Sequence, residues 1–105
     1  MDGQTWMAKK YLKSKPLCKV TFHLPKEGTL AAQSVTLAGD FNNWDQQATP
    51  MKRRKNGDFM VIMELEKDRD YRFRYCIDGE RWETDWSADR FAPNPFGGYD
   101  SVVVV

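Results

Sequence analysis

Hydrophobic and polar residues alternate in short segments along most of the chain, and turn-forming residues separate these segments. A period of two places every second side chain on the same face of a β-strand. Aromatic and β-branched residues are frequent in the segments, as is typical of strands. The segments predicted to be strands are 17–24, 34–38, 59–65, 71–77, 82–85 and 101–105.

Two dipeptides predict tight turns between strands. Asn56-Gly57 precedes one predicted strand, and Asp78-Gly79 follows another. Both dipeptides accept the positive φ angles that hairpin turns require, so the segment 82–85 is expected to pair back on the strand before it. Strands and turns at this spacing predict an all-β fold, an immunoglobulin-like sandwich of about seven antiparallel strands.

The length of 105 residues indicates a single domain. Residues 1–15 are basic and are interpreted as an N-terminal tail or arm, and residues 16–105 as the sandwich module. Within the first segment, Trp6, Tyr11 and Leu12 could form one helical turn or lie on the sheet. A mobile tail is the favoured interpretation.

The charges nearly balance, with 16 Lys and Arg against 15 Asp and Glu. No overall field therefore draws the chain toward nucleic acid or anionic lipid. No apolar run is long enough to span a membrane, and the N-terminus lacks the apolar core of an export signal. A cytoplasmic location is expected. The basic run 52–55 leads straight into the Asn56-Gly57 turn, and we interpret it as a solvated hairpin tip.

Cysteine and histidine offer no metal site. Cys18 shares a face with the apolar residues of its strand, whereas Cys76 is out of phase with those of its own, so two reduced thiols are predicted. The single histidine, His23, falls on the polar face of a strand and is expected to be solvated. Neither a metal nor a cofactor is expected.

Side chains of the strand 71–77 separate into two sets. The first is large and apolar and is expected in the core: Tyr71, Phe73, Tyr75 and Ile77. The second is expected to face outward: Arg72, Arg74 and Cys76. An outward Arg74 could meet Trp44, which ends an early strand, and Trp82, which follows a hairpin.

Such a surface suits a sugar. The C–H face of a pyranose ring lies flat on an indole, and the sugar hydroxyls need polar partners such as Arg74, Asn42 or Asn43. Asn42 and Asn43 are more simply turn residues, and we assign no sugar contact to Asn43. Phe41 is expected to point into the core, which leaves Trp44 presented outward.

Three motifs resemble the glycogen- and starch-binding modules of carbohydrate-binding module family 48. They are VTLAGDFNNWD at 35–45, YRFRYCIDGERW at 71–82 and PNPFGGYDSVVVV at 93–105. This family comprises early-set sandwich domains that precede the barrels of isoamylases and branching enzymes, and it also occurs in the β subunit of AMP-activated protein kinase. The resemblance covers the chain from about residue 17 to its end.

The resemblance implies a carbohydrate-binding site of five residues. Trp44 and Trp82 would stack on an α-1,4-glucan, and Arg74 would take the position of a sugar-bonding lysine. Phe96 would push into the bend of the glucan, and Asp100 stands where those modules have an asparagine. Glu80-Arg81 puts one more residue before Trp82 than those modules carry. Trp86 has the same strand parity and is the alternative second stacking residue.

No catalytic function is predicted. Glycoside hydrolysis needs two carboxylates flanking the bond in a cleft. Asp85 and Asp89 are conceivable members of such a pair, but so small a sandwich offers little concavity. The predicted function is a non-catalytic, monomeric module that binds an α-glucan polysaccharide or oligosaccharide, with a glycan-metabolising enzyme in trans as a possible partner. The alternative is a protein-interaction module whose valine strand, 102–105, pairs with a partner at a sheet edge.

Overall fold

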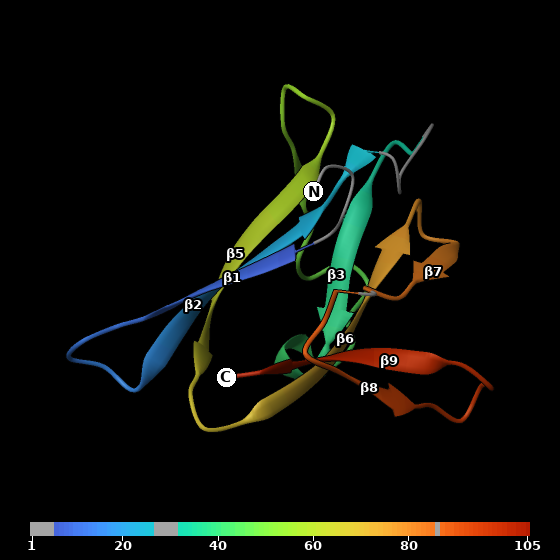
Figure 1. The fold of residues 1–105 in the computed structure, drawn as a ribbon. Coiled ribbons are helices and arrows are strands. Elements are labelled where there is room, and N and C mark those ends of the chain that lie inside the picture. Colours follow the sequence, from blue (N-terminus) through green and yellow to red (C-terminus); the bar gives the residue numbers. More distant parts are fainter. Residues whose placement is uncertain (1–5, 27–31, 86) are drawn as a thin grey trace.

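The computed structural model describes residues 6–26, 32–85 and 87–105. These residues form two antiparallel sheets that face each other across one core (Figure 1). The early-set, immunoglobulin-like sandwich predicted from the sequence is confirmed. Sheet A consists, in spatial order, of β1 (Trp6–Tyr11), β2 (Leu17–Leu24), β5 (Phe59–Glu66) and β4 (Lys52–Arg53). Sheet B consists of β3 (Val35–Gly39), β6 (Asp70–Ile77), β9 (Tyr99–Val104) and β8 (Arg90–Pro93), and β7 (Arg81–Glu83) also pairs with β6.

Aromatic side chains from both sheets pack in the core. The rings of Phe22 in β2 and Phe73 in β6 meet edge to face at 5.0 Å, and Tyr75 packs on Phe73 at 5.8 Å. The predicted parity of β6 is confirmed for its apolar set, which is buried throughout: Tyr71, Phe73, Tyr75 and Ile77. Because the aromatic side chains of the core each remove a large apolar area from water, they dominate the stability of the sandwich.

Both predicted hairpin turns are present. Asp78 and Gly79 have φ angles of 54° and 71°, and the turn returns the chain so that β7 pairs with β6. Gly57 has a φ of 96° in the turn between β4 and β5. The basic run at that turn is exposed, as a solvated hairpin tip requires. Strands β4 and β8 were not expected.

The N-terminal segment is a strand, so the expectation of a mobile tail is wrong for Trp6–Tyr11. Strand β1 pairs with Cys18–His23 of β2, which is the alternative in which this arm lies on the sheet. The basic character of the segment predicted a solvated tail, but Lys9 finds partners far along the chain. Its Nζ lies 2.6 Å from Asp89 Oδ2 and donates to the carbonyl of Val104 at 2.7 Å. Residues 1–5 lie outside the described residues.

His23 is buried, so the expectation of a solvated histidine is wrong. Its Nε2 lies 2.8 Å from Oδ2 of Asp58, which follows the turn before β5. Burial raises the pKa of Asp58, but hydrogen bonds from the Lys26 amide, His23 and Asn56 together with the charge of His23 outweigh it. The pKa of Asp58 is therefore lowered. A charged partner supplied by the neighbouring hairpin is what makes burial of His23 tolerable.

Both cysteines are free thiols, as predicted, and both are buried. Cys76 shares the outward parity of Arg72 and Arg74, as predicted, but it is buried rather than exposed to solvent. In the register of sheet B it stands between Thr36 of β3 and Trp82 of β7. Burial raises the pKa of the Cys76 thiol.

The valine strand is not an edge of its sheet. Strand β9 lies between β6 and β8, and both Val102 and Val103 are buried. Because an interior strand has both sides hydrogen-bonded, β9 cannot template a partner strand along the length that β6 and β8 cover. The expectation that the whole valine run lies at a free sheet edge is therefore wrong.

Candidate functional site

The segment after β3 is a tight turn held by one amide. The single-turn 3₁₀ helix η2 (Asp40–Asn42) follows β3 directly. The side-chain oxygen of Asn42 accepts the backbone N–H of Gly39 at 3.0 Å, and its nitrogen donates to the carbonyl of Leu37 and to Oγ1 of Thr49, both at 2.9 Å. Asn43 then adopts left-handed geometry with a φ of 58°. The prediction that these two asparagines turn the chain is confirmed.

The turn packs closely against β6 and the core. A Cβ atom on Gly39 would lie 2.4 Å from the carbonyl oxygen of Arg72, so only glycine allows this approach. The ring of Phe41 packs at 5.7 Å from Phe22 and at 6.1 Å from Tyr71. Phe41 is therefore the inward anchor that the sequence predicted.

Trp44 is half-buried and its indole is held in place. Like the residue before it, Trp44 has a φ of 58°. Its indole Nε1 donates to Oδ1 of Asp40 at 3.0 Å, while Oδ2 of Asp40 accepts the backbone N–H of Arg72 at 2.8 Å. One carboxylate thus links the indole to β6. Because Asp40 is exposed, both bonds lie at the surface, beside the outer face of sheet B.

Arg74 and Trp82 share the outer face of sheet B. Trp82 stands opposite Cys76 in the register of β6 and β7, and Cys76 has the same parity as Arg74. The turn closes with the N–H of Glu80 donating to the carbonyl of Ile77 at 3.1 Å. The additional residue before Trp82 therefore does not turn the indole away from this face.

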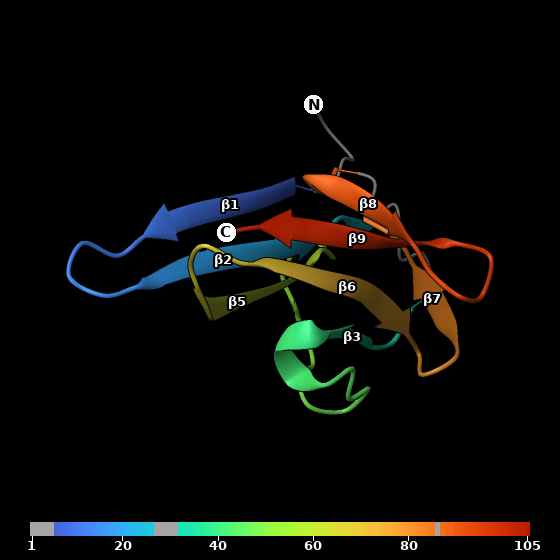
Figure 2. The ribbon, with the colours of Figure 1, turned by 90° about the horizontal axis from the view of Figure 1, so that it is seen from below.

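The β8–β9 hairpin presents Phe96 at its tip, where the side chain is 90% exposed. Figure 2 shows the hairpin projecting at the end of the molecule where β7 also lies. Asn94 supports the tip, because its side-chain oxygen accepts the N–H groups of Phe96 and Gly98 at 2.9 and 3.1 Å. Its side-chain nitrogen donates to Asp100 at 3.2 Å. The hairpin thus holds an apolar ring in solvent on a rigid base.

These elements enclose one open hollow of about 770 Å³. All five predicted site residues line it: Trp44, Arg74, Trp82, Phe96 and Asp100. The structure brings together residues from four separate parts of the chain. Trp86 lies outside the described residues.

Sequence reasoning missed five further residues of the lining: Asp40, Gln46, Arg72, Asn94 and Pro95. Arg72 has the parity of Arg74, and that signal was present in the alternation of β6. Nothing in the sequence around Asp40 predicts that its carboxylate accepts a hydrogen bond from the indole four residues later, because this bond depends on the left-handed geometry of the turn.

The two arginines of the hollow differ in their partners. Arg72 Nη1 lies 3.5 Å from Oδ2 of Asp100, which is itself 7% exposed. The guanidinium of Arg74 makes no hydrogen bond or ion pair within the described part of the chain, and its Nε is buried without a partner there. An unpaired buried donor is costly, so Arg74 is the group of the hollow best placed to gain from a ligand oxygen.

The acidic pair considered for catalysis lies elsewhere and has structural partners. Asp85 is fully buried and accepts the hydroxyl of Tyr75 at 2.8 Å and the hydroxyl of Ser87 at 2.7 Å. Burial and the charge of Asp85 raise the pKa of Tyr75. Asp89 is paired with Lys9. Among the described residues, no cluster of His, Cys, Asp and Glu is arranged to hold a metal ion. No helix in the described ranges is long and apolar enough to cross a membrane.

Comparison with known proteins agrees with the geometry. Residues 29–92, more than half of the chain, match carbohydrate-binding module 48, the isoamylase N-terminal domain. The chain is also 40% identical over 62 residues to the 1,4-alpha-glucan branching enzyme GlgB of Aquifex aeolicus. That match covers 58% of this chain and 10% of the enzyme, so the chain spans only a small part of the relative's length. The chain belongs to carbohydrate-binding module family 48.

Proposed function

We propose that this module binds α-1,4-glucan chains, such as glycogen or starch-like polymers, in the hollow on sheet B. The observation that supports this most is the convergence of two indoles, an exposed phenyl ring and an unpaired guanidinium on one open surface. Trp44 and Trp82 provide flat apolar faces for pyranose rings. Arg74 provides donors for sugar hydroxyls, and Phe96 provides an apolar tip at the rim.

The role of Asp100 differs from that of an amide. Its two oxygens face Asn94 and Arg72, at 3.2 and 3.5 Å. We therefore propose that Asp100 mainly orients Asn94 and Arg72, and that it accepts a hydrogen bond from a sugar hydroxyl as a secondary contact. An open surface of this kind binds weakly, with a Kd in the micromolar to millimolar range, about −4 to −8 kcal/mol.

We propose that the module is not itself catalytic and serves an enzyme by holding its polymer substrate. Cleavage or transfer of a glycosidic bond requires a free pair of carboxylates on opposite sides of the bond. Both carboxylates of the hollow have other partners, because Asp40 is bonded to Trp44 and Arg72, and Asp100 faces Asn94 and Arg72. The likeness to a 1,4-alpha-glucan branching enzyme supports an enzyme of glucan metabolism as the partner.

Affinity electrophoresis with glycogen in a native gel tests this proposal. We expect glycogen to retard the unmodified module. The Trp44→Ala variant should migrate as it does without glycogen, because it lacks the main stacking surface while the inward anchor Phe41 keeps the turn in place. Tyr11→Ala is the matched control, since Tyr11 is also an exposed aromatic but lies on β1 of the other sheet.

The expected loss on removing Trp44 is at least tenfold in affinity, which corresponds to about 1.4 kcal/mol. Circular dichroism establishes that the variant is folded. A folded Trp44→Ala variant that glycogen retards as strongly as the unmodified module would contradict the proposal.

A further inference from the structure

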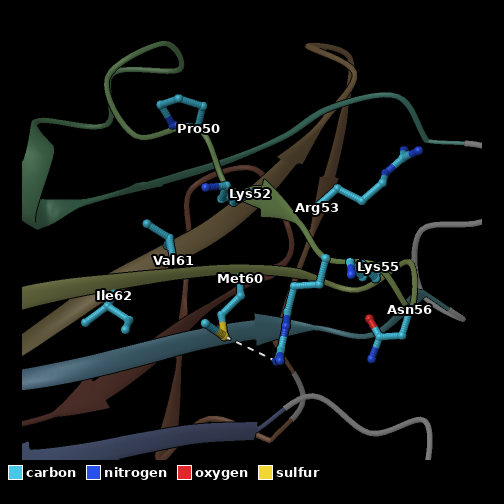
Figure 3. Close-up of a pocket in the computed structure, with 9 residues that line it drawn as sticks. Pro50, Lys52, Arg53, Lys55, Asn56, Met60, Val61 and Ile62 are labelled. Atoms are coloured by element: carbon cyan, nitrogen blue, oxygen red, sulfur yellow. Dashed lines mark hydrogen bonds between the residues drawn. The ribbon is translucent and has the colours of Figure 1, made fainter.

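A second hollow lies on the opposite side of the molecule, against sheet A. It encloses about 750 Å³ between β5 and the segment that leads into the β4–β5 hairpin. Figure 3 shows apolar side chains from β5, Met60 and Ile62 among them, beside basic side chains from the hairpin. The side chain of Ile62 is 54% exposed, which is unusual for an aliphatic residue in the middle of a long strand. This hollow shares no residue with the one on sheet B.

Three cations at the rim have no acidic partner. Within the described part of the chain, no carboxylate pairs with Lys52, Arg54 or Lys55, and the guanidinium of Arg54 bonds only the sulfur of Met60, at 3.7 Å. Arg53 is different, because its guanidinium bonds the carbonyl of Ala32 and lies over the ring of Phe59. The rim therefore carries a concentrated positive charge that no described carboxylate neutralises.

The strand beside this hollow has an unpaired edge. Strand β4 pairs only with Phe59 and Met60, although β5 continues to Glu66. From Val61 onward, no described strand pairs with β5 on the side away from β2. A strand edge with free N–H and C=O groups can accept an extended segment as an additional strand.

We propose that this hollow, which we call the basic groove (Pro50, Lys52–Asn56 and Met60–Ile62), docks an extended acidic protein segment. Carboxylates of the segment would face Lys52, Arg54 and Lys55. An apolar side chain between them would cover Ile62 and Met60, and the segment's backbone would run along the open edge of β5. The module would then hold its glucan on sheet B and its protein partner on sheet A.

The apolar floor of the groove favours a protein over a nucleic acid. A polyanion of phosphates would meet the three cations, but it would leave Ile62 and Met60 without apolar contacts. Single-stranded nucleic acids need aromatic side chains for base stacking, and the lining of the groove contains none. An acidic segment with a leucine or isoleucine satisfies the charges and the floor together.

Fluorescence anisotropy with defined probes tests this proposal on the complete chain. The main probe is a fluorescein-labelled peptide of alternating glutamate and leucine. One control peptide has serine in place of each leucine, and another has glutamine in place of each glutamate. Oligothymidine of matched length is the nucleic-acid probe. We expect the glutamate–leucine peptide to bind at least tenfold more tightly than the other three, with shifts of the Ile62 methyl signals in NMR spectra.

Paired charge reversals locate the site. Lys52→Glu with Lys55→Glu should weaken binding of the peptide at least tenfold, because attraction becomes repulsion at the rim. Lys10→Glu with Lys13→Glu changes the net charge equally on another part of the surface and should leave binding within about twofold. Ile62→Ser should weaken binding about fivefold. Since all five residues are exposed, these variants should fold, and glycogen should still retard them.

Any of four results would overturn the proposal. These are the absence of binding by the glutamate–leucine peptide, equal binding of the serine peptide, equal or tighter binding of oligothymidine, and equal loss in the two charge-reversed variants. None of these results bears on glucan binding, which the glycogen gel reports separately.

Discussion

Asp40 is a surface carboxylate that fixes the position of another residue's ring. Its Oδ1 accepts the indole N–H of Trp44, and its Oδ2 accepts the backbone N–H of Arg72. Hydrogen bonds to a charged acceptor are stronger than neutral ones. We therefore propose that Asp40 is a positioning residue, because it would lower the cost of ordering the indole for the stacking proposed above.

Removing this carboxylate should weaken sugar binding without unfolding the module. We expect Asp40→Ala to bind maltoheptaose about five- to tenfold more weakly, which corresponds to about 1 to 1.4 kcal/mol. The affinity of Asp40→Asn should lie between those of Asp40→Ala and the unmodified protein, since an amide oxygen can still accept one of the two N–H groups. Isothermal titration calorimetry measures the affinities, and thermal unfolding provides the control for folding.

A structural role alone predicts a different outcome. If Asp40 only stabilised the turn, Asp40→Ala would lower the melting temperature and leave the affinity of the folded protein unchanged. Equal affinities for the alanine variant and the unmodified protein would thus contradict the positioning role.

At the scale of elements, two turn carboxylates connect the stability of the strands to pH. Asp78 accepts the backbone N–H groups of Gln33 and Ser34 at 2.8 and 2.9 Å, and these bonds lower its pKa. The pKa of Asp58 is also lowered, since its hydrogen bonds outweigh the effect of burial. Asp58 thus bonds Lys26, just after β2, and Asp78 bonds the two residues just before β3, so each carboxylate links a turn to a distant part of the chain.

The sign of the pH effect follows from the direction of these shifts. A carboxyl group with a lower pKa in the folded state stabilises the fold above its unfolded pKa of about 4. That stability is lost as the pH falls through the folded pKa. We therefore expect the melting temperature to be level near pH 6 and to drop below about pH 4, as followed by circular dichroism.

Substitution of Asp78 tests the cause of this drop. Asp78→Asn should lower the melting temperature at neutral pH and make the acid drop smaller. Asp68→Asn is the matched control, because Asp68 is an exposed turn residue with positive φ that makes no hydrogen bond through its side chain in the described ranges. An acid drop that is identical in Asp78→Asn and in the unmodified protein would show that Asp78 does not contribute.

The long strands and the hairpins were predictable because their signals are local. Alternation in 71–77 assigned Tyr71 and Phe73 to the core, and two Gly-containing turns placed the hairpins. Strand β1 was not predictable in the same way. Its lysines indicate a tail until Asp89, far along the chain, is brought beside Lys9 by the fold. The burial of His23 was not predictable for the same reason, because its partner Asp58 comes from another hairpin.

At the scale of the whole molecule, the sandwich carries two unrelated hollows on its two sheets. The hollow on sheet B is lined by aromatic rings, by charges that are paired and by the unpaired guanidinium of Arg74. The basic groove on sheet A is lined by aliphatic side chains and by the cations Lys52, Arg54 and Lys55, which have no acidic partner among the described residues. Strand β9 is interior to sheet B as far as Val102, where its pairing with β8 ends. That the module is a monomer stays a prediction.

The convergence of the aromatic residues on one hollow could be predicted because they lie in sequence motifs, whereas the residues that orient them could not. Trp44, Trp82 and Phe96 stand at recognisable turns. The contributions of Asp40 and Asn94 depend on backbone geometry, namely the left-handed turn after η2 and the hairpin tip that Asn94 bonds. The alternation of β6 placed Arg74 on the outer face, but only the structure shows that its guanidinium lacks a partner among the described residues.

Titration of the isotope-labelled protein with maltoheptaose, followed by NMR, tests glucan binding in this hollow most directly. We expect the indole N–H signals of Trp44 and Trp82 and the Nε–H signal of Arg74 to shift together along one saturating curve. Cellohexaose, whose β-1,4 linkages give a straight chain, should shift them little. If these three signals stay unchanged in the folded protein at saturating maltoheptaose, or respond equally to cellohexaose, the hollow on sheet B is not an α-glucan site.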